Sequence, residues 1–214
     1  MRRAFDVISA AVGLVVLSPL FAVIALVIKL ENDGPVFYSQ PRMGKDFRKF
    51  RLLKFRSMVP DADRAGGALT GPADGRITRA GKFLRAFKLD ELPQLINLLK
   101  GDMRLVGPRP ELERFVEMFR PQYALILRER PGLTDPASLV YRQEDRILGP
   151  GNVEAQYVTR ILPRKLELSL EYQQHRTFLS DLGIIFRTVF GLPWVPRDPS
   201  PIPRDTPPDL STKA

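Results

Sequence analysis

The chain has 214 residues, of which 44% are hydrophobic, and a formal net charge of +9. This length and composition exclude a wholly disordered protein and predict one folded unit with a real core. The positive charge predicts an anionic partner, which is nucleic acid, an acidic membrane surface or a phosphorylated small molecule. Cysteine is absent, which excludes disulfides, thiolate metal sites and cysteine nucleophiles. The single histidine, His175, lies in a polar run and is expected on an exposed helix face.

The first segment of the chain is apolar. Residues 7 to 28 carry no charge over 22 residues, and a helix needs about 20 to cross a bilayer. Ser18-Pro19 lies near the middle, where proline removes a backbone donor, so we predict a break with the Ser18 hydroxyl satisfying a freed carbonyl. Basic residues flank both ends. Basic charge on both sides predicts that residues 1 to 31 form a re-entrant membrane hairpin with both ends cytoplasmic. The alternatives are a kinked spanning helix and a cleaved signal peptide.

Asp6 stands directly before the apolar segment. An acid in this position is costly unless it is paired. Arg2 and Arg3 lie within one helical turn of it, so we expect one of them to pin the start of the helix at the membrane interface.

The next segment is basic and aromatic. Short strands are predicted at residues 36 to 40 and within residues 47 to 55. Interleaved basic and aromatic residues are typical of nucleic-acid surfaces and of membrane interfaces. The apolar segment directly upstream favours the membrane and counts against nucleic acid. Residues 59 to 75 are rich in glycine and small residues and predict a loop, for which a lid role is one hypothesis.

The remainder predicts a mixed α/β fold that is mostly helical, with a small β element and interfacial amphipathic helices on a cytoplasmic catalytic domain, residues 32 to 191. Residues 81 to 102 predict two short helices, the second beginning at Asp90 and ending near Gly101. Periodicity over residues 111 to 132, interrupted at Pro121, fits either a core helix or an interfacial one.

The C-terminal third of the chain is less sharply patterned. A turn and a short strand are predicted over residues 131 to 145, and one or two helices over residues 154 to 190. Residues 192 to 214 hold 7 prolines in 23 positions and predict a disordered or extended tail.

Two adjacent acids, Asp90 and Glu91, stand between groups of basic residues. Asp90 is predicted to be a helix N-cap with Pro93 in the first turn, a position where an ionised carboxylate is stabilised. A purely structural role as a helix cap would by itself explain an aspartate at this position. However, the surrounding cations exceed what one cap requires, and they suggest a phosphate-bearing substrate: Arg76, Arg79, Lys82, Arg85, Lys88, Arg104 and Arg109. Carboxylates in a phosphate site suggest Mg²⁺, with one acid attacking phosphorus while the other holds the metal.

Several motifs occur in order along the chain: RRAFD, the Ser18-Pro19 break, DGPVFYSQPRMGKDF, LLKFRSM, RITRAGKFLR, LDELPQLINLLKGDMRLVGPRPE and RPGLT. Together they resemble the small monotopic phosphoglycosyl transferases, the bacterial sugar transferases that act on undecaprenyl phosphate. The resemblance covers about residues 1 to 190 and is to the minimal form, which lacks the four-helix N-terminal region of longer relatives.

The resemblance implies transfer of a sugar 1-phosphate from a UDP-sugar to undecaprenyl phosphate, giving undecaprenyl-diphosphate-sugar and UMP, as the first membrane step of surface glycan synthesis. It implies a monotopic protein of the bacterial inner membrane with its catalytic domain on the cytoplasmic face, in contact with membrane lipids, and leaves a homo-oligomer open. Asp90 would be the nucleophile that forms a phosphosugar-aspartyl intermediate, and Glu91 would help to hold Mg²⁺. By position, phosphate binding or site structure is implied for Lys54, Arg56, Arg79, Arg85 and Arg109.

Some positions depart from the family pattern. Arg2 stands where lysine is common, Ser57 where threonine is common, and Arg104 where serine is common. The turn after RPGLT reads DPAS instead of a glycine with an aromatic or aliphatic residue. These departures leave the chemistry intact and put the choice of sugar and the acceptor side in question. Two alternatives stay open: a non-catalytic basic module that binds anionic lipid, and direct transfer in which both acids bind the metal.

Overall fold

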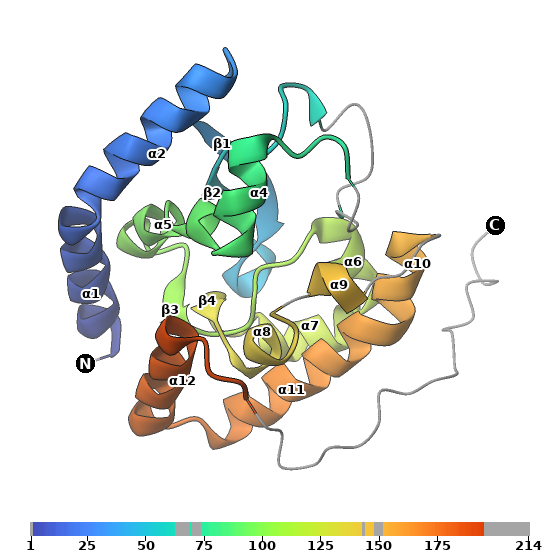
Figure 1. Cartoon of the computed structure of the whole chain (residues 1–214). Coiled ribbons are helices and arrows are strands. Elements are labelled where there is room, and N and C mark those ends of the chain that lie inside the picture. The colour runs from blue at the N-terminus through green and yellow to red at the C-terminus, as the bar shows by residue number, and fades with distance from the viewer. Residues whose placement is uncertain (1, 63–68, 70–73, 143, 148–151, 195–214) are drawn as a thin grey trace.

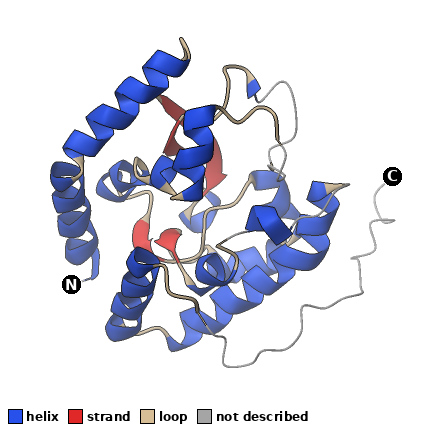
Figure 2. Ribbon diagram, viewed as in Figure 1, coloured by secondary structure: helices blue, strands red, loops and turns tan. Residues whose placement is uncertain are grey.

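The computed structural model describes residues 2–62, 69, 74–142, 144–147 and 152–194. Within them the fold is mixed α/β and mostly helical, as expected (Figure 2). In chain order the elements are α1 (Arg2–Val16), α2 (Ser18–Glu31), β1 (Phe37–Met43), η1 (Lys45–Phe47), β2 (Lys49–Phe55), α4 (Arg79–Ala86), η2 (Leu89–Glu91), α5 (Gln94–Lys100), β3 (Arg104–Val106), α6 (Glu113–Met118), α7 (Arg120–Ile126), β4 (Gly132–Thr134), α8 (Pro136–Val140), α9 (Glu144–Ile147), α10 (Val153–Gln156), η3 (Tyr157–Ile161), α11 (Leu162–His175) and α12 (Phe178–Phe190). Most of the predicted lid loop and most of the proline-rich tail lie outside the described residues.

The apolar N-terminal segment forms two helices, α1 and α2, along one edge of the molecule (Figure 1). They meet at Leu17 with a bend of 61°. The Ser18 hydroxyl donates to the carbonyl of Val15 at 2.8 Å, which is the carbonyl that Pro19 leaves without its usual donor. The predicted break and its repair are therefore confirmed. In the described part of the chain no single helix is long and apolar enough to cross a bilayer, whereas the bent pair together is.

One face of the bent pair packs against the rest of the chain and the other is exposed. Ala10 of α1 packs with Leu95 and Leu98 of α5, and Ile24 and Ile28 of α2 pack with residues of β2 and α4. Apolar side chains on the opposite face remain exposed, among them Ile8, Val12, Val15, Val23, Leu26 and Leu30. The pair is thus attached to the fold along its length and still presents an apolar surface.

Two small two-stranded sheets complete the scaffold. β1 and β2 form an antiparallel hairpin in which Phe37 pairs with Phe55 and Tyr38 with Lys54. This confirms both predicted strands, and the first continues to Met43, beyond its predicted end. β3 and β4 pair in parallel, and neither the pairing nor β3 was predicted. The predicted strand after RPGLT is wrong beyond Thr134, because Asp135 accepts a hydrogen bond from the backbone N–H of Ser138 at 2.8 Å and starts helix α8 instead.

The main core lies between α6, α7, η3 and α11. Phe115, Val116 and Ile126 are almost fully buried there, with Tyr157 and Leu166 against them. The choice left open for residues 111 to 132 is therefore settled in favour of core packing. The interruption at Pro121 is confirmed, since α6 ends and α7 begins around Phe119. His175 is exposed at the end of α11, as expected.

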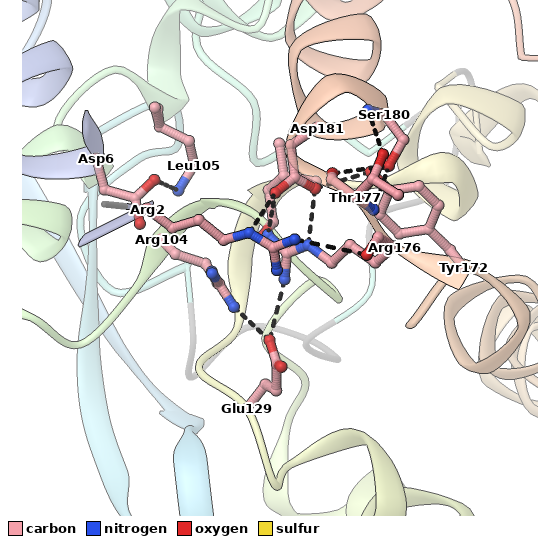
Figure 3. A network of polar contacts seen from close by, with 11 residues as sticks. Arg2, Asp6, Arg104, Leu105, Glu129, Tyr172, Arg176, Thr177, Ser180 and Asp181 are labelled. Carbon is pink, nitrogen blue, oxygen red and sulfur yellow. Dashed lines mark hydrogen bonds and ion pairs between the residues drawn. The ribbon is translucent and has the colours of Figure 1, made fainter. Parts of the chain in front are cut away.

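A partly buried network of charged groups joins the N-terminus to the C-terminal helix (Figure 3). The guanidinium of Arg176 donates to both carboxylate oxygens of Asp181, at 2.7 and 2.8 Å, and to Glu129 at 3.0 Å. Arg104 pairs with the same Glu129 carboxylate, and Arg2 of α1 lies 3.9 Å from Asp181. Phe5 meets Phe178 edge to face at 5.5 Å. These contacts tie α1 to β3 and α12.

The predicted partner of Asp6 is wrong. Asp6 is buried and accepts a hydrogen bond from the backbone N–H of Leu105, at 3.2 Å (Figure 3). Arg2 reaches Asp181 instead, and Arg3 donates to the carbonyl of Leu98 at 2.7 Å, at the end of α5. The long arginine side chains reach carbonyls and acids of distant elements, while the short Asp6 side chain bonds the strand beside it.

The substitution Arg176→Met tests the network. It leaves the buried Asp181 carboxylate without its bidentate partner, so the free energy of unfolding is expected to fall by about 3 to 5 kcal/mol. Lys49→Met, which removes an exposed ion pair with Glu113, is the matched control and is expected to cost less than about 1 kcal/mol. Chemical denaturation of the purified chain in detergent measures both. Equal effects of the two substitutions would contradict a stabilising role for the network.

Candidate active site

Helix α4, which leads into the two acids, is capped from two directions. The Thr78 hydroxyl accepts a hydrogen bond from the backbone N–H of Gly81 at 2.9 Å. The Glu31 carboxylate, at the end of α2, accepts from the backbone N–H of Arg79 at 2.7 Å and of Ala80 at 3.0 Å. An acid at a helix N-terminus is stabilised by the free N–H groups and the helix dipole. The end of the apolar helix pair is therefore attached to the start of the active-site helix.

Close packing places α4 against the strand that carries Lys54. A Cβ atom on Gly81 would lie 2.0 Å from the carbonyl oxygen of Ser57, so this helix can approach the end of β2 only because residue 81 is glycine. Asn97 of α5 holds the same strand from the other side, since its amide oxygen accepts from the N–H of Leu53 at 3.0 Å and its amide nitrogen donates to the carbonyl of Arg51 at 2.8 Å. β2 is thus fixed between α4 and α5.

The predicted position of Asp90 as a helix N-cap is wrong. Lys88 has a left-handed backbone, with φ of 58°, and turns the chain from α4 into the 3-10 turn η2, which contains Asp90 and Glu91. Helix α5 begins at Gln94, directly after Pro93. Proline is well suited to a helix start because its φ is already helical and its missing N–H is not needed there. The predicted helix end is confirmed, since Gly101 is the C-cap with φ of 90°.

Glu91 is the centre of a buried cluster of charges. Both of its carboxylate oxygens accept hydrogen bonds from the guanidinium of Arg109, one of them at 2.9 Å. The Lys54 ammonium lies 3.5 Å from the same carboxylate. Burial by itself would raise the pKa of Glu91, but the charges of Arg109 and Lys54 outweigh it and hold that pKa well below its usual range. Glu91 is therefore ionised.

Asp90 has a different environment from its neighbour. Its side chain is 4% exposed, and its Oδ1 atom is buried without a hydrogen-bond partner in the part of the chain that the structure describes. Burial raises the pKa of Asp90 above its usual value, against the lowering effect of Lys54, while Glu91 adds to the rise. The prediction that a helix cap keeps Asp90 ionised is therefore wrong, since only side-chain cations favour its charged form.

The predicted phosphate-binding residues fall into two groups. Lys54 and Arg109 contact Glu91 directly, and the charge of Arg85 lowers the pKa of Asp90, as does that of Lys88. Arg56 and Arg79 lie elsewhere. The Arg56 guanidinium donates to the carbonyl of Pro35 at 2.8 Å, and the Arg79 side chain is exposed at the start of α4. Their role in phosphate binding stays a prediction.

A second buried polar network adjoins the cluster and was not predicted. Arg42 of β1 pairs with Glu111 at 2.7 Å, and the Tyr157 hydroxyl donates to the other oxygen of Glu111 at 2.5 Å. Lys165 of α11 lies 2.6 Å from Glu144. The Glu91 carboxylate is the main cause of the raised pKa of Arg109, and both of these acids add to the rise. In sequence, only the position of Glu111 directly after GPRP hinted at this network.

The acidic side chains of the site can be compared with the ligands that a Mg²⁺ ion requires. No cluster of three or more acid, histidine or cysteine side chains suited to a metal is found among the described residues. Mg²⁺ in phosphate sites is often held by one or two carboxylates, with water and substrate phosphates completing the shell. The ionised Glu91 and the unpartnered oxygen of Asp90 meet that smaller requirement, although Arg109 already engages Glu91. The residues therefore fit a metal that arrives with a phosphorylated substrate.

Replacing Asp90 tests its unfavourable burial. Because burial raises the pKa of Asp90 in the folded protein above its usual value, the folded protein binds the proton more tightly than the unfolded chain does, so the contribution of this residue to stability is lost as the pH rises through the raised pKa. We expect the Tm of Asp90→Asn, relative to wild type, to increase from pH 4 towards neutral pH. Glu113→Gln, an exposed acid on α6, controls for the loss of one carboxylate. A difference that shrinks over this range would contradict the raised pKa.

Known proteins show the same pattern of sequence. The profile of the bacterial sugar transferase family matches residues 1–193. The UDP-N-acetylgalactosamine-undecaprenyl-phosphate N-acetylgalactosaminephosphotransferase of Aeromonas hydrophila is 38% identical over 192 residues, covering 88% of this chain and 43% of that protein. The UDP-glucose:undecaprenyl-phosphate glucose-1-phosphate transferase of Caulobacter vibrioides is 37% identical over 194 residues, covering 89% and 69%. Exopolysaccharide production protein ExoY of Rhizobium meliloti is 34% identical over 205 residues, covering 88% and 83%. The chain thus spans less than half of the Aeromonas relative and most of the Rhizobium one, and it belongs to the bacterial sugar transferase family.

Proposed function

We propose that this chain is a phosphoglycosyl transferase that moves a sugar 1-phosphate from a UDP-sugar to undecaprenyl phosphate, producing undecaprenyl-diphosphate-sugar and UMP. The names of relatives from Aeromonas and Caulobacter support this reaction class. The observation that carries it is the pair of adjacent acids with opposite environments. Glu91 is bound by Arg109 and Lys54, while Asp90 keeps an oxygen without a partner within the described residues.

The reaction proceeds in two displacements at one phosphorus atom. An Asp90 carboxylate oxygen attacks the phosphorus that bears the sugar, and the bond from that phosphorus to the bridging oxygen of the diphosphate breaks. UMP leaves with the bridging oxygen and its electron pair. An oxygen of undecaprenyl phosphate then attacks the same phosphorus and displaces the Asp90 carboxylate, which regenerates the free acid. Neither step requires a net proton transfer to Asp90.

The charge distribution around Asp90 suits this role. A buried carboxylate has lost most of its hydration, so less water must be removed before it attacks. The cations of Lys54, Arg85 and Lys88 act on Asp90 and would also attract the phosphate oxygens of the substrate. Such preorganised positive groups stabilise charge that develops on a phosphoryl group during transfer.

We also propose a Mg²⁺ ion at this site, with Glu91 and substrate phosphates as its ligands. When bound, the ion would offset negative charge on the diphosphate and so help UMP to depart. Arg109 and Lys54 would hold the Glu91 carboxylate in a fixed orientation. An alternative, in which both acids bind the metal and the acceptor attacks the donor directly, predicts no exchange of UMP into UDP-sugar in the absence of acceptor.

Exchange of labelled UMP into UDP-sugar without any acceptor tests the covalent route. Wild type with Mg²⁺ is expected to catalyse exchange with one member of a UDP-sugar panel, because the first displacement is reversible. Asp90→Asn and removal of Mg²⁺ by EDTA should each abolish exchange, while Glu113→Gln on the exposed face of α6 should retain it. Undiminished exchange by Asp90→Asn would sink the nucleophile assignment. Binding to anionic vesicles with no turnover on any sugar would favour the non-catalytic lipid-binding module.

We further propose that the chain is monotopic, with α1 and α2 entering the inner membrane from the cytoplasmic face and returning to it. The bend of 61° between two apolar helices supports this, as do basic residues on both flanks. Aromatic side chains are exposed on two further helices: Phe83 on α4 with Phe87 at its C-cap, and Phe186 and Phe190 on α12. They would place these helices in the membrane interface.

Accessibility of the N-terminus tests the topology. In inverted and right-side-out vesicles, a cysteine placed at residue 4 and another at residue 113, in a chain that has no natural cysteine, are expected to react with a membrane-impermeant thiol reagent from the same, cytoplasmic side. Reaction of the two cysteines from opposite sides would show a spanning helix instead of a hairpin.

A further inference from the structure

Gln94 has a buried donor that the rest of the fold does not explain. In the part of the chain that the structure describes, three buried side-chain atoms have no hydrogen-bond partner: Arg42 Nε, Asp90 Oδ1 and Gln94 Nε2. Arg42 is anchored through its other nitrogens to Glu111 and Gln40, and Asp90 is the proposed nucleophile. Gln94 is 1% exposed. A buried unpaired donor costs stability that an apolar side chain of similar volume would not cost, so it calls for a functional reason.

The same helix contains a buried amide that is fully explained by structure. Asn97 is also 1% exposed, and it bonds the backbone of Leu53 and Arg51 and the carboxylate of Asp102. Helix α5 therefore carries two buried amides, one that is fully hydrogen-bonded and one whose nitrogen has no partner among the described residues. Asn97 makes the contacts that a structural amide is expected to make, and the Gln94 amide nitrogen makes none of them.

Gln94 lies on the turn of chain that directly follows Asp90, the acid proposed to react. It is the first residue of α5 and follows Asp90 by four positions. The backbone between them is helical at Leu92 and Pro93, and residues three or four apart in a helix face the same side. Both side chains are buried, so both enter the interior from the turn between η2 and α5. Each has an unpartnered atom, one an acceptor and the other a donor, and they do not satisfy each other.

We propose that the Gln94 side-chain amide donates a hydrogen bond to an oxygen of the phosphoryl group that Asp90 attacks. This inference rests on the proposed function. A phosphoryl group bonded to Asp90 Oδ1 presents oxygens that accept hydrogen bonds, and it would satisfy both unpartnered atoms together. A neutral amide can do this without another charge next to Lys54 and Arg109. Gln94 thereby becomes a phosphoryl-binding residue in addition to the arginines and lysines that the sequence singled out.

Two substitutions at Gln94 and one at Asn97 separate this role from packing. Gln94→Met keeps the volume and removes the donor, so its Tm is expected to equal or exceed that of wild type, whereas Asn97→Leu should lower the Tm because it breaks satisfied hydrogen bonds. Loss of a hydrogen bond to a charged group corresponds to about a ten- to hundredfold lower rate of UMP exchange in Gln94→Met. Gln94→Glu should be slower still, because a carboxylate at this position repels the phosphoryl oxygens.

The outcomes distinguish this inference from the proposed function. If wild type exchanges UMP while Gln94→Met exchanges it at the same rate, the proposed hydrogen bond does not exist. A fall in the Tm of Gln94→Met as large as that of Asn97→Leu would show a structural amide instead. Exchange by Gln94→Glu as fast as by wild type would contradict the donor role even if Gln94→Met failed to fold. Absence of exchange by wild type with every UDP-sugar would instead refute the covalent route of the proposed function, on which this inference rests.

Discussion

The bidentate ion pair between Arg109 and Glu91 is the contact on which the arrangement of the site depends. It joins the loop after β3 to the turn η2 and, with Lys54 from β2, encloses one carboxylate in positive charge. Arg109 bonds Glu91, while its neighbour Asp90 has a buried oxygen without a hydrogen-bond partner among the described residues, and the pKa values of the two acids move in opposite directions. Adjacent acids with environments that differ in this way can take different chemical roles. The different roles proposed for Asp90 and Glu91 therefore follow from the residues around each acid and not from the residue type.

The scaffold explains how a small turn can hold this arrangement. Asn97 fixes the strand that carries Lys54 to helix α5, and the close contact at Gly81 fixes helix α4 to the other end of that strand. Glu31, at the end of the apolar helix pair, caps α4. The apolar helix pair and the two acids are thus connected by one helix. The charged network around Arg176 secures the other end of α1 in the same way.

The sequence predicted features that depend on local chemistry. The break at Ser18-Pro19, the two strands of the hairpin, and the helix end at Gly101 all have residue types that force a conformation. The cap assignment of Asp90 failed because a left-handed Lys88 has no residue signature, and it inserts a turn before Pro93. The parallel pairing of β3 with β4 brings together residues far apart in the chain, which periodicity does not reveal. Family motifs indicated Asp90, Glu91, Lys54 and Arg109, but the contact of Arg109 with Glu91 and the unpartnered amide of Gln94 become visible only in three dimensions.

The most direct test of the central claim is to find which side chain carries the phosphosugar. The protein, mixed with Mg²⁺ and the UDP-sugar that supports exchange, is quenched in acid without acceptor and mapped by peptide mass spectrometry. We predict one added phosphosugar on Asp90, which disappears when undecaprenyl phosphate is added before the quench. An adduct on Glu91, or unmodified protein under conditions in which UMP exchange is rapid, would contradict the assignment of Asp90 as the acid left free to react.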